Sequence, residues 1–217
     1  MRFLERTPDR YDAGMRFITF GAVDDLHDAL AVAVVRQAGD RVVEIGCGTG
    51  TLTARLVARG AEVTAFDQNA AMMAQAEARL RAATAGRVSF VERTAAEMDS
   101  LPPASADAVV ASLSFSEMSA DERAFVLVAA CRALRPGGLL AIGDEVRPRR
   151  WWQRAVFAFV RGPQAALGWL LAGSLSHPIA DLSDEVARAG FVVRSEQRWL
   201  LGTLAVVVAD RPDGETR

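Results

Sequence analysis

Short apolar runs alternate with helical patterns along most of this 217-residue chain. Each run is about five residues long and rich in valine or alanine, which is typical of a buried strand. Between the runs, apolar residues recur at three- and four-residue spacing, which is typical of a helix that packs one face on a sheet. Five such strands are predicted before residue 145, at "RVVEIG", "AEVTAF", "RVSFV", "DAVVAS" and "LLAIGD".

The predicted helices have recognisable starts and stops. Leu26, Leu30 and Val34 recur at four-residue spacing and predict a helix over 24–38, which Gly39 would end. Ser119 and Glu122 have the spacing of a capping box, which predicts a helix through residue 134, ended by "RPGG". Further helices are expected over 51–59, 70–83 and 182–190.

These elements predict an α/β fold of one domain. We expect a Rossmann-like, seven-stranded, mostly parallel sheet with helices on both faces, closed by an antiparallel hairpin from "FVVRSEQRWL" and "TLAVVVAD". The expected parts are an N-terminal helical lid over 1–39, a core over 40–146, a helical insertion after strand five over 147–181, and a closing helix and hairpin over 182–210.

Composition narrows the class of protein. A hydrophobic content of 51% supports one core, and a net charge of −2 provides no global basic field for a nucleic acid, so no nucleic-acid partner is expected. Cys47 and Cys131 are too few for a disulfide framework or a zinc site, and no metal is expected. The N-terminus lacks an apolar signal-peptide stretch and no apolar run spans a bilayer, which predicts a cytoplasmic protein.

Three glycines follow the first predicted strand in "EIGCGTG". Gly46, Gly48 and Gly50 would let the chain turn tightly and let a ligand approach the backbone at a helix N-terminus. A dinucleotide fingerprint would need glycine at Thr51, and a phosphate loop would need a lysine after the last glycine. Neither phosphate-binding motif is present in this loop.

The loop resembles motif I of the class I S-adenosylmethionine-dependent methyltransferases, in which an acidic and an apolar residue precede G-x-G-x-G. Other motifs of that family follow in order over about residues 40–145, as "VTAFD", "VERTAAEM", "DAVVASLSFSEM" and "ALRPGG". The resemblance implies a methyltransferase with S-adenosylmethionine as its cofactor.

The same resemblance implies a set of cofactor-binding residues. Glu44 would support the methionine end, and Asp67 would accept hydrogen bonds from both ribose hydroxyls. Gln68 or Met72 would cover one adenine face, although Met72 is equally consistent with a place in the core. The adenine edge would meet Thr94 and Ala95, where the family often has an acidic residue followed by alanine; the remaining contacts are Gly46, Cys47, Gly48, Gly50 and Ser112.

Methyl transfer requires in-line displacement at an activated sulfonium, so positioning carries much of the catalysis and a base is needed only if the acceptor must lose a proton. The catalytic residue is left open. Glu117 and Asp144 are candidates expected to face the crevice at the ends of strands four and five, and His177 is a third. His27 is interpreted as structural, and Cys47 as a small residue that fits the loop.

Aromatic residues flank the cofactor motifs. Tyr11 and Phe17 resemble the lid of quinone-biosynthesis methyltransferases, and Trp151 and Trp152 open an aromatic insertion. We therefore expect a small-molecule or lipid-like acceptor. The insertion could instead form a homodimer surface or, through residues 147–175, contact a membrane as a peripheral, arginine-rich helix pair.

A weaker resemblance links "ERTPDRYDAGMRF", "GDEVRP" and the His177–Pro178 junction to a bacterial subfamily of corrinoid protein-associated methyltransferases. It implies a corrinoid-protein partner, because this chain has no D-x-H-x-x-G pattern of its own. The alternative function is a cofactor-binding accessory protein that partners another enzyme and transfers nothing itself.

Overall fold

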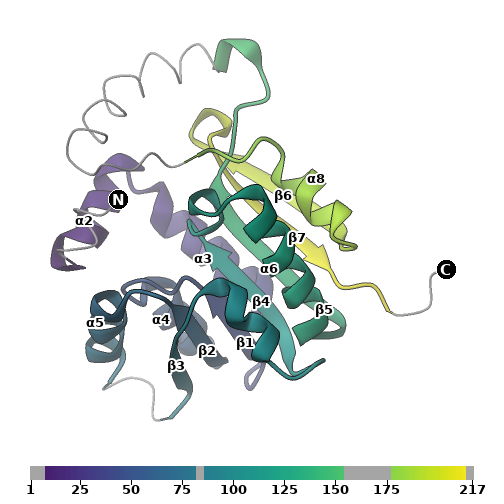
Figure 1. Ribbon diagram of the computed structural model, residues 1–217. Helices are drawn as coiled ribbons and strands as arrows, with labels where there is room; N and C mark the ends of the chain where they lie inside the picture. Colours follow the sequence, from purple (N-terminus) through teal and green to yellow (C-terminus); the bar gives the residue numbers. More distant parts are fainter. Residues whose placement is uncertain (1–7, 82–85, 154–176, 214–217) are drawn as a thin grey trace.

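A computed structural model describes residues 8–81, 86–153 and 177–213. Its elements alternate as the sequence predicts, with seven strands in one sheet (Figure 1). The strands are β1 (Arg41–Ile45), β2 (Glu62–Asp67), β3 (Val88–Glu92), β4 (Ala106–Ser112), β5 (Leu134–Glu145), β6 (Val192–Trp199) and β7 (Leu204–Asp210). The α-helices are α2 (Pro8–Ile18), α3 (Ala22–Val34), α4 (Thr51–Ala58), α5 (Ala70–Leu80), α6 (Ala120–Ala133) and α8 (Leu182–Arg188).

The strand order is β3-β2-β1-β4-β5-β7-β6. Strands β1 to β5 pair in parallel, whereas β7 runs antiparallel to both β5 and β6. The mostly parallel sheet and the closing hairpin are therefore confirmed. This order places β1 between β2 and β4, so β2 and β3 lie on one side of β1 and β4 and β5 on the other. In such sheets, ligands bind beyond the carboxyl ends of the strands at the point where the order reverses.

Side chains of each central strand alternate between two apolar layers. On β1, Val43 and Ile45 face a cluster that includes Val126, Leu127 and Leu182 of α6 and α8. Val42 faces a second cluster, which includes Leu26, Leu30, Leu52 and Leu56 of α3 and α4. Figure 1 shows α6 in front of the sheet and α3 behind it, so the expectation of helices on both faces is confirmed.

Two helix boundaries differ from the sequence prediction. Helix α3 ends at Val34 rather than near residue 38, because the Asp40 carboxylate accepts hydrogen bonds from the backbone N–H groups of Arg36 and Gln37 and turns the chain early. The "RPGG" stretch lies within β5, which begins at Leu134 directly after α6 ends. The capping box of Ser119 and Glu122 at the start of α6 is present as expected.

The ends of the predicted insertion meet at the carboxyl end of β5. Val146 forms a parallel bridge with Ile179, and the Arg147 N–H donates to the Ile179 carbonyl. Residues 154–176, on which the expected helical lid depends, lie outside the described residues. The insertion thus leaves and re-enters the fold at the edge of the sheet where the glycine loop lies.

Candidate active site

A cavity of about 640 Å³ lies at the carboxyl ends of the central strands. It brings together residues from the ends of β1, β2, β3 and β4, with Tyr11 from α2. The predicted site residues that line it are Tyr11, Gly46, Gly48, Asp67, Gln68, Met72, Thr94, Ala95, Ser112 and Glu117. Sequence motifs spread over more than one hundred residues thus converge on one cavity.

The three motif glycines have three different structural roles. All have positive φ, at 70°, 52° and 77° for Gly46, Gly48 and Gly50. A Cβ on Gly46 would lie 2.7 Å from the Ser114 Cβ, and one on Gly50 would lie 2.9 Å from the Ala76 Cβ. A Cβ on Gly48 would meet no atom within 4 Å. Only Gly48 therefore leaves its bare backbone open toward the cavity, whereas Gly46 and Gly50 permit close packing.

Asp67 ties the glycine loop to the end of β2. Its Oδ2 accepts from the Gly48 N–H at 2.8 Å, and its Oδ1 accepts from the Asn69 N–H at 2.8 Å. A carboxylate oxygen can accept more than one hydrogen bond, so each oxygen can still accept a further one, and Asp67 lines the cavity. Asp67 therefore both orders the loop and faces the ligand space.

Met72 and Thr94 have double roles. Met72 is 3% exposed and also lines the cavity, so its core and wall positions coincide. The Thr94 backbone N–H and hydroxyl both donate to Glu97 Oε2, at 2.9 and 3.2 Å, which caps a short 3₁₀-helix (Ala95–Ser100). The Thr94 oxygen can still accept a hydrogen bond from the cavity side.

The Glu44 side chain lies on the side of the sheet that α4 covers, opposite to Val43 and Ile45. It is 1% exposed and its Oε2 accepts from the Thr53 hydroxyl at 2.6 Å. Burial raises the pKa of Glu44 to about 8, with the Asp67 charge adding to the effect and the Thr53 hydrogen bond opposing it. Cys47 is also buried, and burial raises the pKa of its thiol, which is unfavourable for a nucleophile.

A second cavity, of about 50 Å³, lies on the α3 side of the glycine loop. Glu44, Cys47 and His27 line it, and it shares a rim with the larger cavity at Tyr11, Gly46, Gly48, Ser112 and Leu113. His27 is buried, and its Nε2 lies 3.0 Å from Ser112 Oγ. No local sequence pattern indicates this pair, because 85 residues separate its members.

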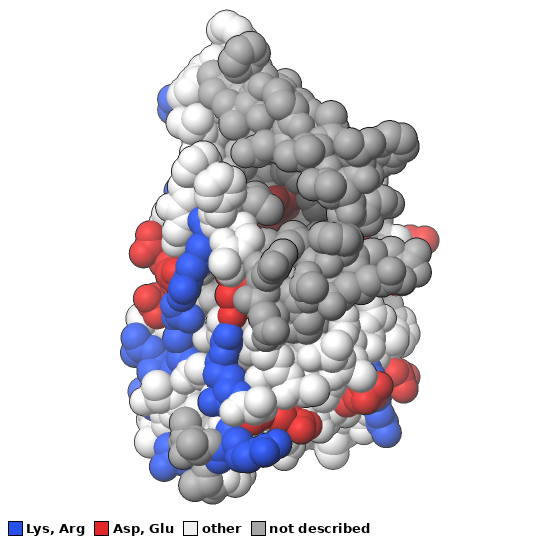
Figure 2. Space-filling view, turned by 90° about the vertical axis from the view of Figure 1, so that its left-hand side faces the viewer, with Lys and Arg blue, Asp and Glu red and all other residues white. Residues whose placement is uncertain are grey.

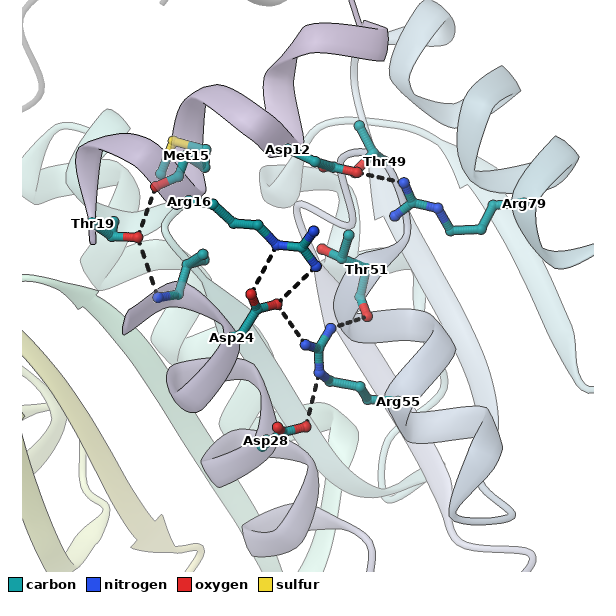
Figure 3. A network of polar contacts seen from close by, with 11 residues as sticks. Asp12, Met15, Arg16, Thr19, Asp24, Asp28, Thr49, Thr51, Arg55 and Arg79 are labelled. Atoms are coloured by element: carbon teal, nitrogen blue, oxygen red, sulfur yellow. Dashed lines mark hydrogen bonds and ion pairs between the residues drawn. The ribbon is translucent and has the colours of Figure 1, made fainter. Parts of the chain in front are cut away.

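Helix α2 is fastened over the glycine loop by polar contacts (Figure 3). Asp12 accepts from the Thr49 hydroxyl at 2.6 Å and forms an ion pair with Arg79 of α5. Arg16 pairs with Asp24 of α3, which also pairs with Arg55 of α4. These contacts were not expected from the sequence, since most of them join residues that are far apart along the chain, such as Asp12 and Arg79.

The three catalytic candidates occupy different environments. Glu117 is exposed and lines the large cavity. Asp144 is fully buried and accepts backbone hydrogen bonds from Phe115, Ser116 and Glu145, so the expectation that it faces the crevice is wrong. Burial raises its pKa to about 6, against the pull of these hydrogen bonds. His177 is exposed, and its backbone N–H donates to the backbone carbonyl of Ser116, the residue before Glu117.

Of the residues predicted to contact the acceptor, one lines the cavities and the others are exposed outside them. Tyr11 lines both cavities, but Phe17 is 82% exposed and is absent from the walls of either cavity. Trp151 and Trp152 are 78% and 40% exposed, so they do not belong to the core of the described residues. Within the described ranges, no helix combines the length and apolarity needed to cross a membrane.

Residues 42–138 match a protein family described as a methyltransferase domain. The chain is 34% identical over 140 residues to a ubiquinone biosynthesis O-methyltransferase from Idiomarina loihiensis, which covers 64% of this chain and 54% of that protein. It is 40% identical over 97 residues to a ribosomal RNA small subunit methyltransferase from Anaeromyxobacter, which covers 42% of this chain and 32% of that protein. The chain thus spans about half and a third of these two relatives.

Solved structures share the fold at lower identity. An O-methyltransferase family protein from Burkholderia thailandensis superposes with a TM-score of 0.73 at 21% identity, covering 97% of this chain and 61% of that one. These likenesses show that residues 42–138 resemble a methyltransferase domain and that the chain shares the fold of the solved structure.

Proposed function

We propose that this protein transfers the methyl group of S-adenosylmethionine to a small-molecule or lipid-like acceptor by in-line displacement. The observation that carries the proposal is the cavity of about 640 Å³ at the point where the strand order reverses. Its walls combine an open glycine backbone, an acidic strand end and apolar side chains. A nucleoside with an amino-acid tail requires this mixture of partners.

The described residues fit the cofactor. In this proposal Gly48 lets it lie against the backbone, because a Cβ there would point into open space. Asp67 accepts the ribose hydroxyls with the acceptor directions that Gly48 and Asn69 leave available. Met72 and Ala95 contact the adenine from two walls of the large cavity, and Glu44, which lines the adjoining small cavity, is assigned to the amino-acid tail.

The chemistry assigned to the protein is positioning. When bound, S-adenosylmethionine supplies a methyl group activated by a sulfonium, and the chain must hold an acceptor on the far side of that methyl group. Glu117 is the exposed carboxylate on the cavity wall and is our candidate base for an acceptor that must lose a proton. Asp144 instead orders the turn after β4 through its backbone hydrogen bonds.

Three observations support a small or lipid-like acceptor. Helix α2 lies against the cavity through Tyr11 and is fastened there by Asp12, so the helix covers part of the ligand space. Figure 2 shows that on one face of the molecule arginines lie among acidic residues, and Arg55 and Arg79 form ion pairs with aspartates. This mixed surface of described residues lacks the uniformly basic character that a nucleic-acid acceptor requires. The ubiquinone relative adds a precedent for a lipid-like acceptor.

Calorimetry with S-adenosylmethionine tests the cofactor site. Asp67→Ala should weaken binding about ten- to a hundredfold, since a hydrogen bond to a charged group contributes about 1.5–3 kcal/mol. Glu92→Ala is the matched control, because Glu92 is the register partner of Asp67 on β3 but does not line the cavity. Equal affinity of a folded Asp67 variant and the wild type would refute this contact.

Methyl transfer is tested separately. The protein is incubated with methyl-labelled cofactor and cell extract, with and without the membrane fraction, and label in organic-soluble products is measured. We expect labelled product that disappears with Gly48→Val. Saturable cofactor binding without labelled product would contradict the proposal and favour the accessory-protein alternative.

A further inference from the structure

A histidine occupies the buried, otherwise apolar face of α3. His27 is 8% exposed and lies beside Leu26 and one turn before Leu30 and Ala31, all of which are fully buried. Its Nε2 is hydrogen-bonded to Ser112 Oγ at 3.0 Å, whereas its Nδ1 is buried without a partner among the described residues. Buried polar groups are almost always paired, so a half-satisfied imidazole on a core face calls for a reason other than packing.

Ser112, its partner, stands at the rim shared by the two cavities. It is the last residue of β4, and the next residue, Leu113, has a φ of 54°, which is uncommon for a residue with a side chain. The Leu113 N–H donates to the Gly143 carbonyl at 2.8 Å and holds this turn. The Ser112 hydroxyl is thereby fixed where a ligand in the large cavity meets the glycine loop.

The imidazole is neutral at pH 7. Burial and, to a smaller extent, the positive charge of Arg55 lower the pKa of His27 to about 4, against the opposing effect of nearby aspartates. A neutral imidazole has one donor and one acceptor nitrogen. The charged and titratable residues that line the small cavity or contribute to this shift are Tyr11, Asp12, Arg16, Asp24, Asp28, Glu44, Cys47 and Arg55.

We propose that His27 is a positioning residue whose Nε2 accepts the Ser112 O–H, so that the Ser112 oxygen presents its lone pairs to the rim and accepts a hydrogen bond from the bound ligand. This inference rests on the proposed function, because the ligand is the cofactor or the acceptor. The chemistry recognised is a hydrogen-bond donor. Two molecules in the site can supply it, namely the cofactor through its ammonium group and the acceptor through a hydroxyl or amine.

Four variants test the pair. Ser112→Ala removes the oxygen, and His27→Leu removes the acceptor while keeping an apolar side chain on the core face. His27→Gln is the conservative rescue, since its amide oxygen can accept the serine hydroxyl. The double variant Ser112→Ala with His27→Leu completes a cycle, in which two residues acting through one hydrogen bond should have non-additive effects.

The first measurement is calorimetric binding of S-adenosylhomocysteine, which carries the ammonium, beside 5′-methylthioadenosine, which lacks it. If the cofactor supplies the donor, Ser112→Ala and His27→Leu should each weaken the binding of S-adenosylhomocysteine about tenfold, and the double variant should bind it no more weakly than either. His27→Gln should recover most of the lost affinity. The affinity for 5′-methylthioadenosine should stay the same in all variants. If the acceptor supplies the donor, both affinities stay constant and the same pattern appears in single-turnover labelling at saturating cofactor.

The tautomer gives a readout that a purely structural histidine would not change. Nitrogen-15 NMR of the wild type should show the proton on Nδ1, with the Nε2 signal shifting on Ser112→Ala. A proton on Nε2, additive effects in the double variant, or unchanged binding and labelling in all folded variants would each overturn the inference. Failure of the proposed function would differ, because the wild type itself would then bind no S-adenosylhomocysteine.

Discussion

At the residue scale, neighbouring positions of one motif have different physical duties. Gly48 has open space where its side chain would be, whereas Gly50 packs against Ala76. The spacing of the motif does not distinguish the roles of these two glycines. Their substitution should therefore separate ligand binding from stability.

We expect Gly48→Val to abolish cofactor binding in a folded protein, at a stability cost of about 1–2 kcal/mol for its positive φ. Gly50→Val should instead lower the free energy of unfolding by several kcal/mol, because its Cβ would lie 2.9 Å from the Ala76 Cβ and 3.2 Å from the Ala76 Cα. Urea unfolding and calorimetry on both variants measure the two effects. Retained cofactor binding in Gly48→Val would contradict the role of this glycine.

Glu44 makes stability depend on pH in an unusual direction. Its folded pKa of about 8 lies above the ordinary value of 4.5, so between these values the folded state binds more protons and loses stability as pH rises. Comparison with Glu44→Gln isolates this group, because Asp144 and His27, with folded pKa values of about 6 and about 4, contribute to the pH dependence of both proteins.

Between pH 6.5 and 7.5, the unfolding free energy of the wild type should fall by up to about 1.4 kcal/mol per pH unit relative to Glu44→Gln. Urea unfolding of both proteins at pH 6.5 and 7.5 measures the difference. Parallel pH profiles would show that Glu44 is already ionised in the folded protein.

At the element scale, α2 is held by polar contacts more than by a core. Of its described side chains, Met15 is buried, while Asp12 and Arg16 make the ion pairs of Figure 3. Partly exposed pairs contribute about 0.2–1 kcal/mol each, so α2 should open more readily than α6, which lies over the sheet.

Asp12→Ala removes both the Thr49 hydrogen bond and the Arg79 ion pair. Hydrogen exchange of the α2 amides should become about two- to fivefold faster, and S-adenosylhomocysteine should dissociate faster, while α6 exchanges as before. Arg188→Ala is the control, since it breaks an ion pair with Asp184 within α8 and leaves the contacts of α2 in place. Unchanged α2 exchange in Asp12→Ala would show that other contacts hold the helix.

At the scale of the whole molecule, the strand order decides where the parts of the site meet. It places the ends of β1, β2 and β4 side by side and brings both ends of the insertion to the same edge, through Val146 and Ile179. Trp151 and Trp152 follow the carboxyl end of β5 along the chain and are exposed, which suits contact with an acceptor, a second copy of the chain or a lipid surface.

Trp151→Ala with Trp152→Ala should lower methyl transfer while cofactor affinity stays within about twofold, because the glycine loop is untouched. The free energy of unfolding should change by less than about 1 kcal/mol for such exposed residues. Trp199→Ala is the contrasting control, because Trp199 packs against the apolar cluster that includes Leu26 and Leu30 of α3. Its replacement should destabilise the fold. Equal loss of stability in both proteins would show that Trp151 and Trp152 are packed.

Much of this protein was determined by local sequence. Valine-rich runs, the capping box at Ser119 and the glycines after β1 predicted the strands, a helix start and the loop, because such patterns depend on residues a few positions apart. The order of motifs then predicted the family, and Gly48 and Asp67 line one cavity as that order implies.

Only the tertiary structure decided which distant side chains touch. It buried Asp144 against the turn after β4, paired His27 with Ser112 across 85 residues and fastened α2 through Asp12. No local pattern encodes such contacts. They depend on which strand ends the sheet order makes adjacent and which helix faces cover them, and that arrangement follows from burying both apolar layers at once.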